Sequence, residues 1–186
     1  MILVRHGQHN TEVLHPDNEG LTSLGVRQAK LLARRLKSDS VNRVLYSPLP
    51  RAKQTAIILN KEICCLKFSC IRDIIERNPS VSSRLAKELK LSKKDIAASK
   101  KQDALAEKAF HKIFYKPKGK FSREVVVCHG NLIRYFVLRA IGIDSRLWTS
   151  LSIFNAAITI IAVHADGRCR LVSHNDAGHI PFKLLS

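Results

Sequence analysis

The chain has 186 residues, 45% of them hydrophobic, and its 32 Lys and Arg outnumber its 15 Asp and Glu for a formal net charge of +17. This length and composition fit a globular chain with a sizeable core, and they exclude a solenoid repeat or a low-complexity chain. No apolar run is long enough to span a bilayer, and the charge at Arg5 comes too early for a signal peptide. The positive charge predicts an anionic partner: nucleic acid, an acidic membrane surface or a phosphorylated molecule.

The first part of the chain alternates short apolar segments with amphipathic ones. We expect strands at 1–5, 43–46 and 66–70, and helices at 22–37 and 49–61. Thr22 is the expected N-cap of the first helix, because its hydroxyl can accept a hydrogen bond from the first turn. A polar loop is expected at 9–20, where turn-forming residues gather.

Residues 84–120 differ from the rest in composition, because they hold twelve Lys or Arg against four Asp or Glu. This segment supplies +8 of the net charge of +17. Apolar residues recur every four positions from Leu105 to Ile113, which predicts an amphipathic helix in the later half. We interpret the segment at about 80–120 as a basic helical insertion within one domain that spans 1–186, and not as a second domain.

The last part begins with an apolar strand at 124–128 that runs into His129. A helix at 131–141 should follow, with Asn131 as its cap. Two further strands should form a hairpin, at 156–163 and 169–174. Strands and helices thus alternate along most of the chain, which predicts a three-layer α/β/α sandwich with a mostly parallel central sheet.

Two segments that each end a predicted strand are near-duplicates. Leu3-Val4-Arg5-His6-Gly7 and Val126-Val127-Cys128-His129-Gly130 both have the pattern apolar-apolar-X-His-Gly. Ligands of open α/β sheets bind outside the carboxyl ends of the strands, so parallel neighbours would bring His6 and His129 to one edge. The glycine after each histidine would leave room for a ligand to approach closely. The alternative is two exposed polar residues that match by chance.

Two arginines can join these histidines. Arg5 precedes His6, and Arg51 begins the helix after the second strand. Arginine offers a rigid fork of donors that matches the oxygens of a phosphoryl group. The two arginines and two imidazoles therefore predict a phosphoryl-binding pocket, whereas each arginine by itself could be a solvated surface charge.

Four motifs follow one another along the chain: Arg5-His6-Gly7, the segments 21–29 and 47–55, and Cys128-His129-Gly130-Asn131. Together they resemble the motif series of the histidine phosphatase superfamily, which is phosphoglycerate-mutase-like. The tail segments 155–159 and 175–179 are similar to the phosphatase branch of this family. The resemblance covers most of the chain except the basic insertion, and it implies the phosphoglycerate-mutase-like fold.

The resemblance also implies a role for each matching residue. His6 matches the histidine that accepts the phosphoryl group. The other members of the phosphate pocket are matched by Arg5, Arg51 and His129. The general acid of the family is a carboxylate on the loop after the third strand, where Glu76 is the better match and Asp73 is the alternative.

The sequence departs from the mutases of this family, which usually carry Arg-His-Gly-Glu followed by a Trp-Asn pair. Here Gln8 follows Gly7, Glu12 stands where that asparagine is expected, and Asn10 lies two residues early. These departures and the short chain favour the phosphatase branch. Gln8, Asn10 and His179 remain further candidates for a place at the site.

The expected function is a phosphatase that hydrolyses phosphomonoesters through a phosphohistidine on His6, with no metal ion or other cofactor. The resemblance within the phosphatase branch implies a phosphorylated serine or threonine of a protein as the substrate. A small-molecule phosphatase or a phosphohistidine phosphatase would use the same site. The alternative of a different class is a catalytically idle module that binds acidic partners through its basic surface.

The basic segment could also bind nucleic acid, because four aromatic residues lie among its lysines: Phe110, Phe114, Tyr115 and Phe121. Phenylalanines at helical spacing are more typical of a core, so we expect no nucleic-acid partner. A homo-oligomer is compatible with the sequence. Five cysteines, an odd number, favour reduced thiols and a cytoplasmic location, with mitochondria as the alternative.

Overall fold

The computed structural model of this chain describes residues 1–11, 19–119 and 121–186. Within these residues, six strands form one sheet: β1 (Ile2–Arg5), β2 (Arg43–Tyr46), β3 (Phe68–Cys70), β4 (Glu124–Cys128), β5 (Ile158–Val163) and β6 (Cys169–Asp176). Their order is β3-β2-β4-β1-β5-β6, in which the first four are mutually parallel and β5 pairs antiparallel with β1 and β6. The mostly parallel sheet expected from the sequence is confirmed.

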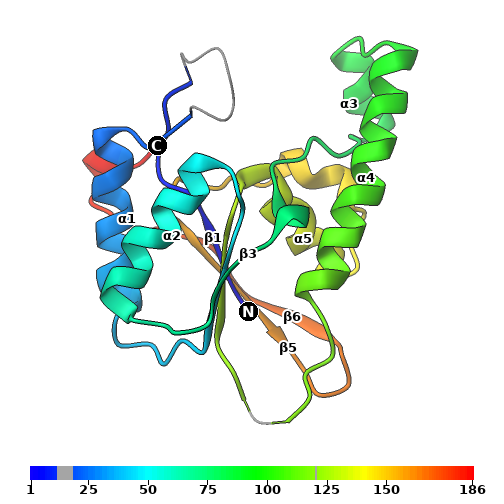
Figure 1. Cartoon of the computed structure of the whole chain (residues 1–186). Helices are drawn as coiled ribbons and strands as arrows, with labels where there is room; N and C mark the ends of the chain where they lie inside the picture. The colour runs from blue at the N-terminus through cyan, green and yellow to red at the C-terminus, as the bar shows by residue number, and fades with distance from the viewer. Residues whose placement is uncertain (12–18, 120) are drawn as a thin grey trace.

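Helices cover both faces of this sheet (Figure 1). They are α1 (Ser23–Leu36), α2 (Pro50–Ile63), α3 (Ser83–Glu88), α4 (Lys93–Ile113) and α5 (Gly130–Ala140). Short 3-10 turns lie in the connections, at η2 (Arg72–Ile74), η3 (Ser145–Ser150) and η4 (Phe182–Leu184). Since α1 and α2 lie on one face and α4 and α5 on the other, the three-layer α/β/α sandwich is confirmed.

The strands divide their side chains between two cores. In β1, Leu3 packs in the core with α4 and α5, whereas Ile2 and Val4 pack in the core with α1 and α2. This alternation follows from the pleat of a strand, which points successive side chains to opposite faces. Because both faces of the sheet are covered, the interiors of the central strands β1, β2 and β4 are apolar, and polar side chains gather where these strands end.

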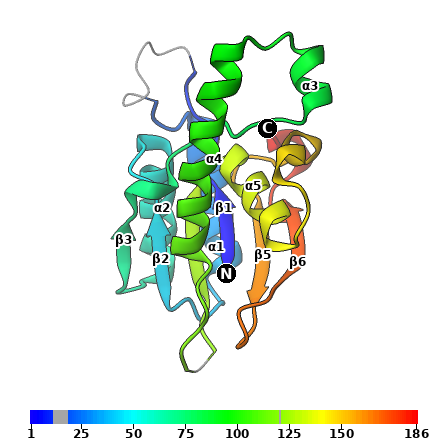
Figure 2. The ribbon, with the colours of Figure 1, turned by 90° about the vertical axis from the view of Figure 1, so that its right-hand side faces the viewer.

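Helix α3 and the first half of α4 rise beyond the edge of the sheet at which the parallel strands end (Figures 1 and 2). The second half of α4 packs into the core through Ala106, Ala109, Phe110 and Ile113. The amphipathic helix expected in this segment is therefore present. Leu105 is nevertheless exposed, because the apolar stripe of the helix runs through its neighbour Ala106.

The start of α5 differs from the expectation. Its N-cap is His129, which has extended backbone, and the helix begins at Gly130. Asn131 is therefore not the cap, and its Nδ2 donates to Oδ1 of Asn78 at 2.8 Å. This bond ties α5 to the loop after η2.

Part of the expected polar loop, residues 12–18 with Glu12 among them, lies outside the described residues. Lys120, at the end of the basic segment, also lies outside them. None of the helices in the described ranges is both long and apolar enough to cross a membrane.

Candidate active site

The two matched histidines lie beside each other at the carboxyl ends of neighbouring strands. Strands β1 and β4 are adjacent and parallel, and the N–H of His6 donates to the carbonyl oxygen of Cys128 at 3.0 Å. The ring centroids of His6 and His129 are 5.2 Å apart, and both side chains are buried. This is the arrangement expected from two duplicated strand ends.

The hydrogen bonds of His6 fix its ring proton on Nδ1. This nitrogen lies 2.7 Å from the carbonyl oxygen of Gly7, which can only accept. Nε2 therefore carries the lone pair, and Nε of Arg51 donates to it at 3.2 Å. Burial lowers the pKa of His6 well below its ordinary value, and the neighbouring imidazole and guanidinium groups lower this pKa further. His6 is thus a neutral imidazole whose lone pair faces Arg51.

His129 is held through Nε2, whereas the ring proton of His6 is held at Nδ1. Its Nε2 lies 2.7 Å from Oγ of Ser47, the residue after β2. Its Nδ1 is buried and has no hydrogen-bond partner within the part of the chain that the structure describes. Burial lowers the pKa of His129 well below its ordinary value, with Arg51 as the next cause. A buried nitrogen of this kind is what an oxygen of a bound ligand would satisfy.

Arg51 is buried in the first turn of α2 and is bonded on two sides. Besides His6, it contacts the carboxylate of Glu19 through Nη1. Glu19 also lies 3.4 Å from Nε2 of His9, whose ring meets His6 edge-on with centroids 4.9 Å apart. Neither Glu19 nor His9 was among the expected site residues, because their contacts depend on the path of a loop that no sequence spacing predicts.

Arg5 lies between the two strand ends and the segment before β5. Its Nη1 donates to the carbonyl oxygen of Ile153 at 2.6 Å. Its Nε is buried without a hydrogen-bond partner among the described residues, so it too could bond a ligand oxygen. Burial lowers the pKa of Arg5, and the nearby carboxyl of Glu76 partly opposes that effect.

The glycines after the two histidines do not leave room for a ligand, so that prediction is wrong. A Cβ on Gly7 would lie 2.5 Å from the carbonyl oxygen of Gly25, and a Cβ on Gly130 would lie 3.3 Å from Nε of Arg5. Protein atoms therefore fill both spaces. Gly7 lets the loop after β1 pack against the first turn of α1, and Gly130 lets the guanidinium of Arg5 approach α5.

The two candidate general acids have different surroundings. Glu76 is half-buried, and burial raises its pKa, although the N–H of Arg77 donates to it at 3.2 Å and the pocket arginines lie near it. Asp73 is bonded to Nζ of Lys112 at 2.9 Å and to Nζ of Lys108 at 3.0 Å, and these bonds lower its pKa. Of the two carboxyls, Glu76 is the better suited to hold a proton near neutral pH.

The structure also describes the three further candidates, which are Gln8, Asn10 and His179. Oε1 of Gln8 accepts from the hydroxyl of Thr22 at 2.8 Å, so this side chain joins the loop to the start of α1. Nε2 of His179 donates to the carbonyl oxygen of Ala156 at 3.1 Å. Asn10 is exposed. Gln8 thus bonds to the start of α1 and His179 to the segment before β5, whereas Arg51 bonds to His6 itself and His129 lies beside it.

Two polar side chains without an expected role hold the loop of His6 in place. Oγ1 of Thr55 accepts from the N–H of Gly7 at 3.0 Å and donates to the carbonyl oxygen of Arg51 at 2.8 Å. Nδ2 of Asn155 donates to the carbonyl oxygen of His6 at 3.0 Å. Thr55 and Asn155 both lie inside the family-like motifs, and that membership was the available signal.

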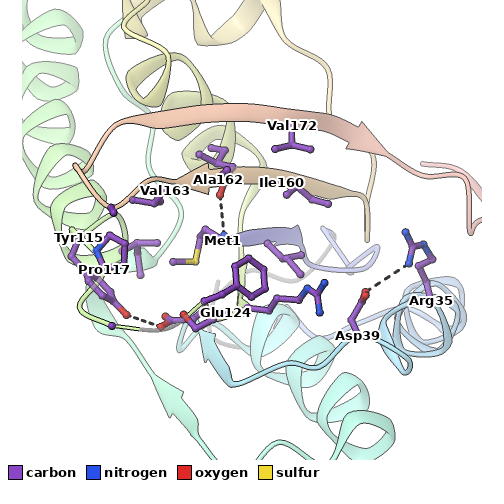
Figure 3. Close-up of a pocket in the computed structure, with 18 residues that line it drawn as sticks. Met1, Arg35, Asp39, Tyr115, Pro117, Glu124, Ile160, Ala162, Val163 and Val172 are labelled. Atoms are coloured by element: carbon purple, nitrogen blue, oxygen red, sulfur yellow. Dashed lines mark hydrogen bonds and ion pairs between the residues drawn. The ribbon is translucent and has the colours of Figure 1, made fainter.

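Neither a metal cluster nor the cavity at the other end of the sheet belongs to this site. Among the described residues, no group of three or more His, Cys, Asp or Glu side chains could hold a metal ion. A cavity of about 540 Å³ lies beside Met1 and Glu124, where the hydroxyl of Tyr115 donates to Glu124 at 2.6 Å (Figure 3). The length of β1 separates this cavity from His6.

Comparisons of the chain with known proteins identify one family. The model of the histidine phosphatase superfamily (branch 1) matches residues 1–104 and 101–177. Serine/threonine-protein phosphatase PGAM5, mitochondrial, of Rattus norvegicus is 30% identical over 191 residues, which are 97% of this chain and 64% of the relative. The Pgam5 protein of the same description from Caenorhabditis elegans is 32% identical over 193 residues, which are 100% of this chain and 66% of the relative.

The chain also resembles a solved structure over nearly its whole length. The phosphoglycerate mutase of Plasmodium falciparum superposes with a TM-score of 0.66 at 26% identity, over 97% of this chain and 92% of that one. The chain thus spans nearly all of a solved relative, but somewhat less than two thirds of the length of the two curated relatives it matches.

Proposed function

Because this chain belongs to the histidine phosphatase superfamily, we propose that it hydrolyses phosphomonoesters through a phosphohistidine formed on His6. One observation carries the proposal: His6 is buried and neutral, with its proton committed to Gly7 and its Nε2 lone pair turned to Arg51. A protonated imidazole would have no lone pair with which to attack phosphorus. The pocket therefore supports a nucleophilic role for His6 rather than an acid role.

In the first step, Nε2 of His6 attacks phosphorus in line, and the bond from phosphorus to the substrate oxygen breaks. Glu76 gives its proton to the departing oxygen, and the raised pKa of this carboxyl supports that role. The phosphoryl oxygens are held by the guanidinium groups of Arg5 and Arg51 and by the imidazole of His129. Nε of Arg5 and Nδ1 of His129 are buried and lack partners in the described structure, so they can bond these oxygens.

In the second step, a water molecule attacks the phosphohistidine, and the bond between phosphorus and Nε2 breaks. Glu76, now a carboxylate, takes the proton of the water. Inorganic phosphate leaves, and His6 returns to its neutral form with the proton on Nδ1. The positive charge that stabilises the transferring group comes from Arg5 and Arg51, so the scheme uses no metal ion or other cofactor.

We propose a phosphorylated serine or threonine of a protein as the substrate. The names of the rat and worm relatives as serine/threonine-protein phosphatases support this choice, and their mitochondrial designation supports a mitochondrial location over the cytoplasmic one expected from the thiols. A mutase is disfavoured, because Gln8 replaces the glutamate of the mutase motif. Steady-state rates on phosphoserine peptides, sugar phosphates and phosphoglycerates would separate protein from small-molecule substrates.

His6→Ala tests the proposal directly. We expect turnover to fall by roughly 10³-fold or more, because the nucleophile is removed, and we expect no acid-labile phosphoenzyme after incubation with ³²P-labelled substrate. The matched control is His164→Ala, at an exposed histidine after β5, which should keep both signals. Retained turnover in a folded His6→Ala protein would contradict the mechanism.

A further inference from the structure

A second cavity, of about 520 Å³, lies between α3, the first half of α4 and η3. Its lining combines cations with apolar side chains, among them Lys87, Lys90, Lys100, Arg146, Leu91 and Ile96. We call this cavity the α3–α4 cleft. The scheme for phosphoryl transfer does not use it.

The cleft carries more positive charge than its own residues neutralise. Arg146 is paired with Asp144 at 2.7 Å, but none of the three cleft lysines forms an ion pair within the described ranges. The one carboxylate in the lining belongs to Asp103, and it accepts from the N–H of Ser80 at 2.7 Å. Elsewhere on α4, by contrast, lysines are paired with Asp73. An anionic ligand would complete the cleft.

The elements that line the cleft lie at the same end of the molecule as His6. Helix α3 and the first half of α4 lie beyond the edge at which the parallel strands end (Figures 1 and 2), and His6 follows β1 at that edge. Ser80 in the cleft lining lies only four positions after Glu76 at the pocket, a span of at most roughly 14 Å. The indole N–H of Trp148 donates to the carbonyl oxygens of Pro79 and Ser80, both at 3.2 Å, and fixes this connection.

The chemistry of the cleft favours a polypeptide over nucleic acid. Bases of single strands stack on exposed aromatic rings, but Phe110 and Phe114 are 6% and 8% exposed and stack on each other in the core. The 82% exposed Phe121 lines the cavity at the opposite end of the sheet. Tyr115 lines the same cavity (Figure 3). The cleft instead offers aliphatic side chains between its lysines, which suits an acidic segment that also carries apolar residues.

We propose that the α3–α4 cleft binds an acidic segment of the phosphoprotein substrate, with Asp or Glu side chains placed roughly four residues from the phosphorylated residue in the His6 pocket. The inference rests on the proposed function, and it names the class of phosphoprotein that the site selects. A small phosphate ester cannot reach both places, whereas an extended peptide can.

The first experiment compares two phosphoserine peptides that differ only in Glu or Gln residues at the fourth and fifth positions on either side of the phosphoserine. We expect the full chain to show a KM at least tenfold lower for the Glu peptide at low salt. The triple variant Lys87→Glu, Lys90→Glu, Lys100→Glu should remove this ratio. The matched control is Lys30→Glu, Lys61→Glu, Lys67→Glu, which changes the net charge equally at exposed lysines outside the cleft and should keep the ratio.

The outcomes that overturn the inference are distinct. Equal KM values for the Glu and Gln peptides would do so, and so would an equal loss of the ratio in both triple variants, because the long-range field would then explain it. A random oligonucleotide that displaces the Glu peptide at equal concentration would assign the cleft to nucleic acid instead.

A binding measurement separates this inference from the proposed function. Fluorescence anisotropy of the non-phosphorylated Glu peptide with the His6→Ala protein needs no catalysis. If this protein binds the Glu peptide, and if adding the three cleft substitutions weakens that binding at least tenfold, the cleft is the peptide site even if His6 is not the nucleophile. Absence of binding would overturn the cleft while leaving the phosphatase mechanism intact.

Discussion

The His6 pocket and the helices α3 and α4 both carry positive charge, but they hold it differently. In the pocket, Arg51 is buried and bonded to His6 and Glu19, and Arg5 is bonded to a backbone carbonyl. On the helices, Lys87, Lys90 and Lys100 contact no carboxylate of the described chain. In the proposed mechanism, buried and bonded cations hold one phosphoryl group in a fixed geometry, whereas exposed cations attract an anion over about 8 Å at physiological salt.

The sharpest test of this difference removes a buried cation. Arg51→Ala should lower kcat/KM for every phosphomonoester by roughly 10²–10³-fold, because a preorganised donor to the transferring group is lost. Arg51→Lys keeps the charge but not the fork of donors, so it should recover only part of the rate. Lys101→Ala, on the exposed face of α4, should leave p-nitrophenyl phosphate hydrolysis unchanged. Similar losses in Arg51→Ala and Lys101→Ala would erase the distinction.

Glu76→Gln should reduce the rate by roughly 10²-fold on a phosphoserine peptide, whose leaving oxygen needs a proton. The loss should be much smaller on p-nitrophenyl phosphate, whose leaving group needs none. Because burial raises the pKa of Glu76, kcat of the native chain should fall as pH rises through that raised pKa, and Glu76→Gln should lose this limb. Asp73→Asn, which breaks the bonds to α4, is the matched control and should keep it.

Stability should depend on pH through the two buried imidazoles. Burial lowers the pKa of His6 and His129 below 6.5, the ordinary value that the unfolded chain retains. Below pH 6.5 the unfolded state therefore binds protons that the folded state does not. The stability that depends on keeping these two histidines neutral should therefore be fully present above pH 6.5. Below pH 6.5, the free energy of unfolding should decrease by up to about 1.4 kcal/mol per pH unit for each histidine.

Urea unfolding at pH 7.5, 6.5 and 5.5 measures this slope. His129→Gln should reduce the slope relative to the native chain, because one of the two imidazoles is gone. His164→Ala removes an exposed imidazole and should leave the slope as it was. An unchanged slope in His129→Gln would mean that His129 is not held neutral by burial.

The smallest expected effect is on the exposed helix itself. Ser92 and Asp95 form a capping box at the start of α4, in which each side chain accepts from the backbone N–H of the other. Ser92→Ala should cost about 1 kcal/mol in the free energy of unfolding. Hydrolysis of p-nitrophenyl phosphate should not change, because the bonds of this cap join only Ser92 and Asp95 at the start of α4. A large loss of hydrolysis would show that the pocket depends on the order of α4.

The sequence predicts best what depends on local pattern. The alternation of apolar residues at β1 and β4 and the duplicated His-Gly ends give the layers and the pairing of His6 with His129. The contact of Glu19 with Arg51 could not be predicted, since it joins residues 32 positions apart through a loop. The packing role of Gly7 could not be predicted either, because the atom that a Cβ at this position would meet belongs to Gly25 in α1. The cap at His129 depends on backbone geometry that Asn131, the better capping residue, does not have.

The ion pair between Glu19 and Arg51 bears on how anions bind in the pocket. Without substrate, the guanidinium of Arg51 already holds an anion that belongs to the chain. In the proposed mechanism, an incoming phosphoryl group would displace that carboxylate from Arg51, and the carboxylate would return when inorganic phosphate leaves. Glu19 would then compete with free phosphate and sulfate for Arg51, so Glu19→Gln should make both anions stronger inhibitors.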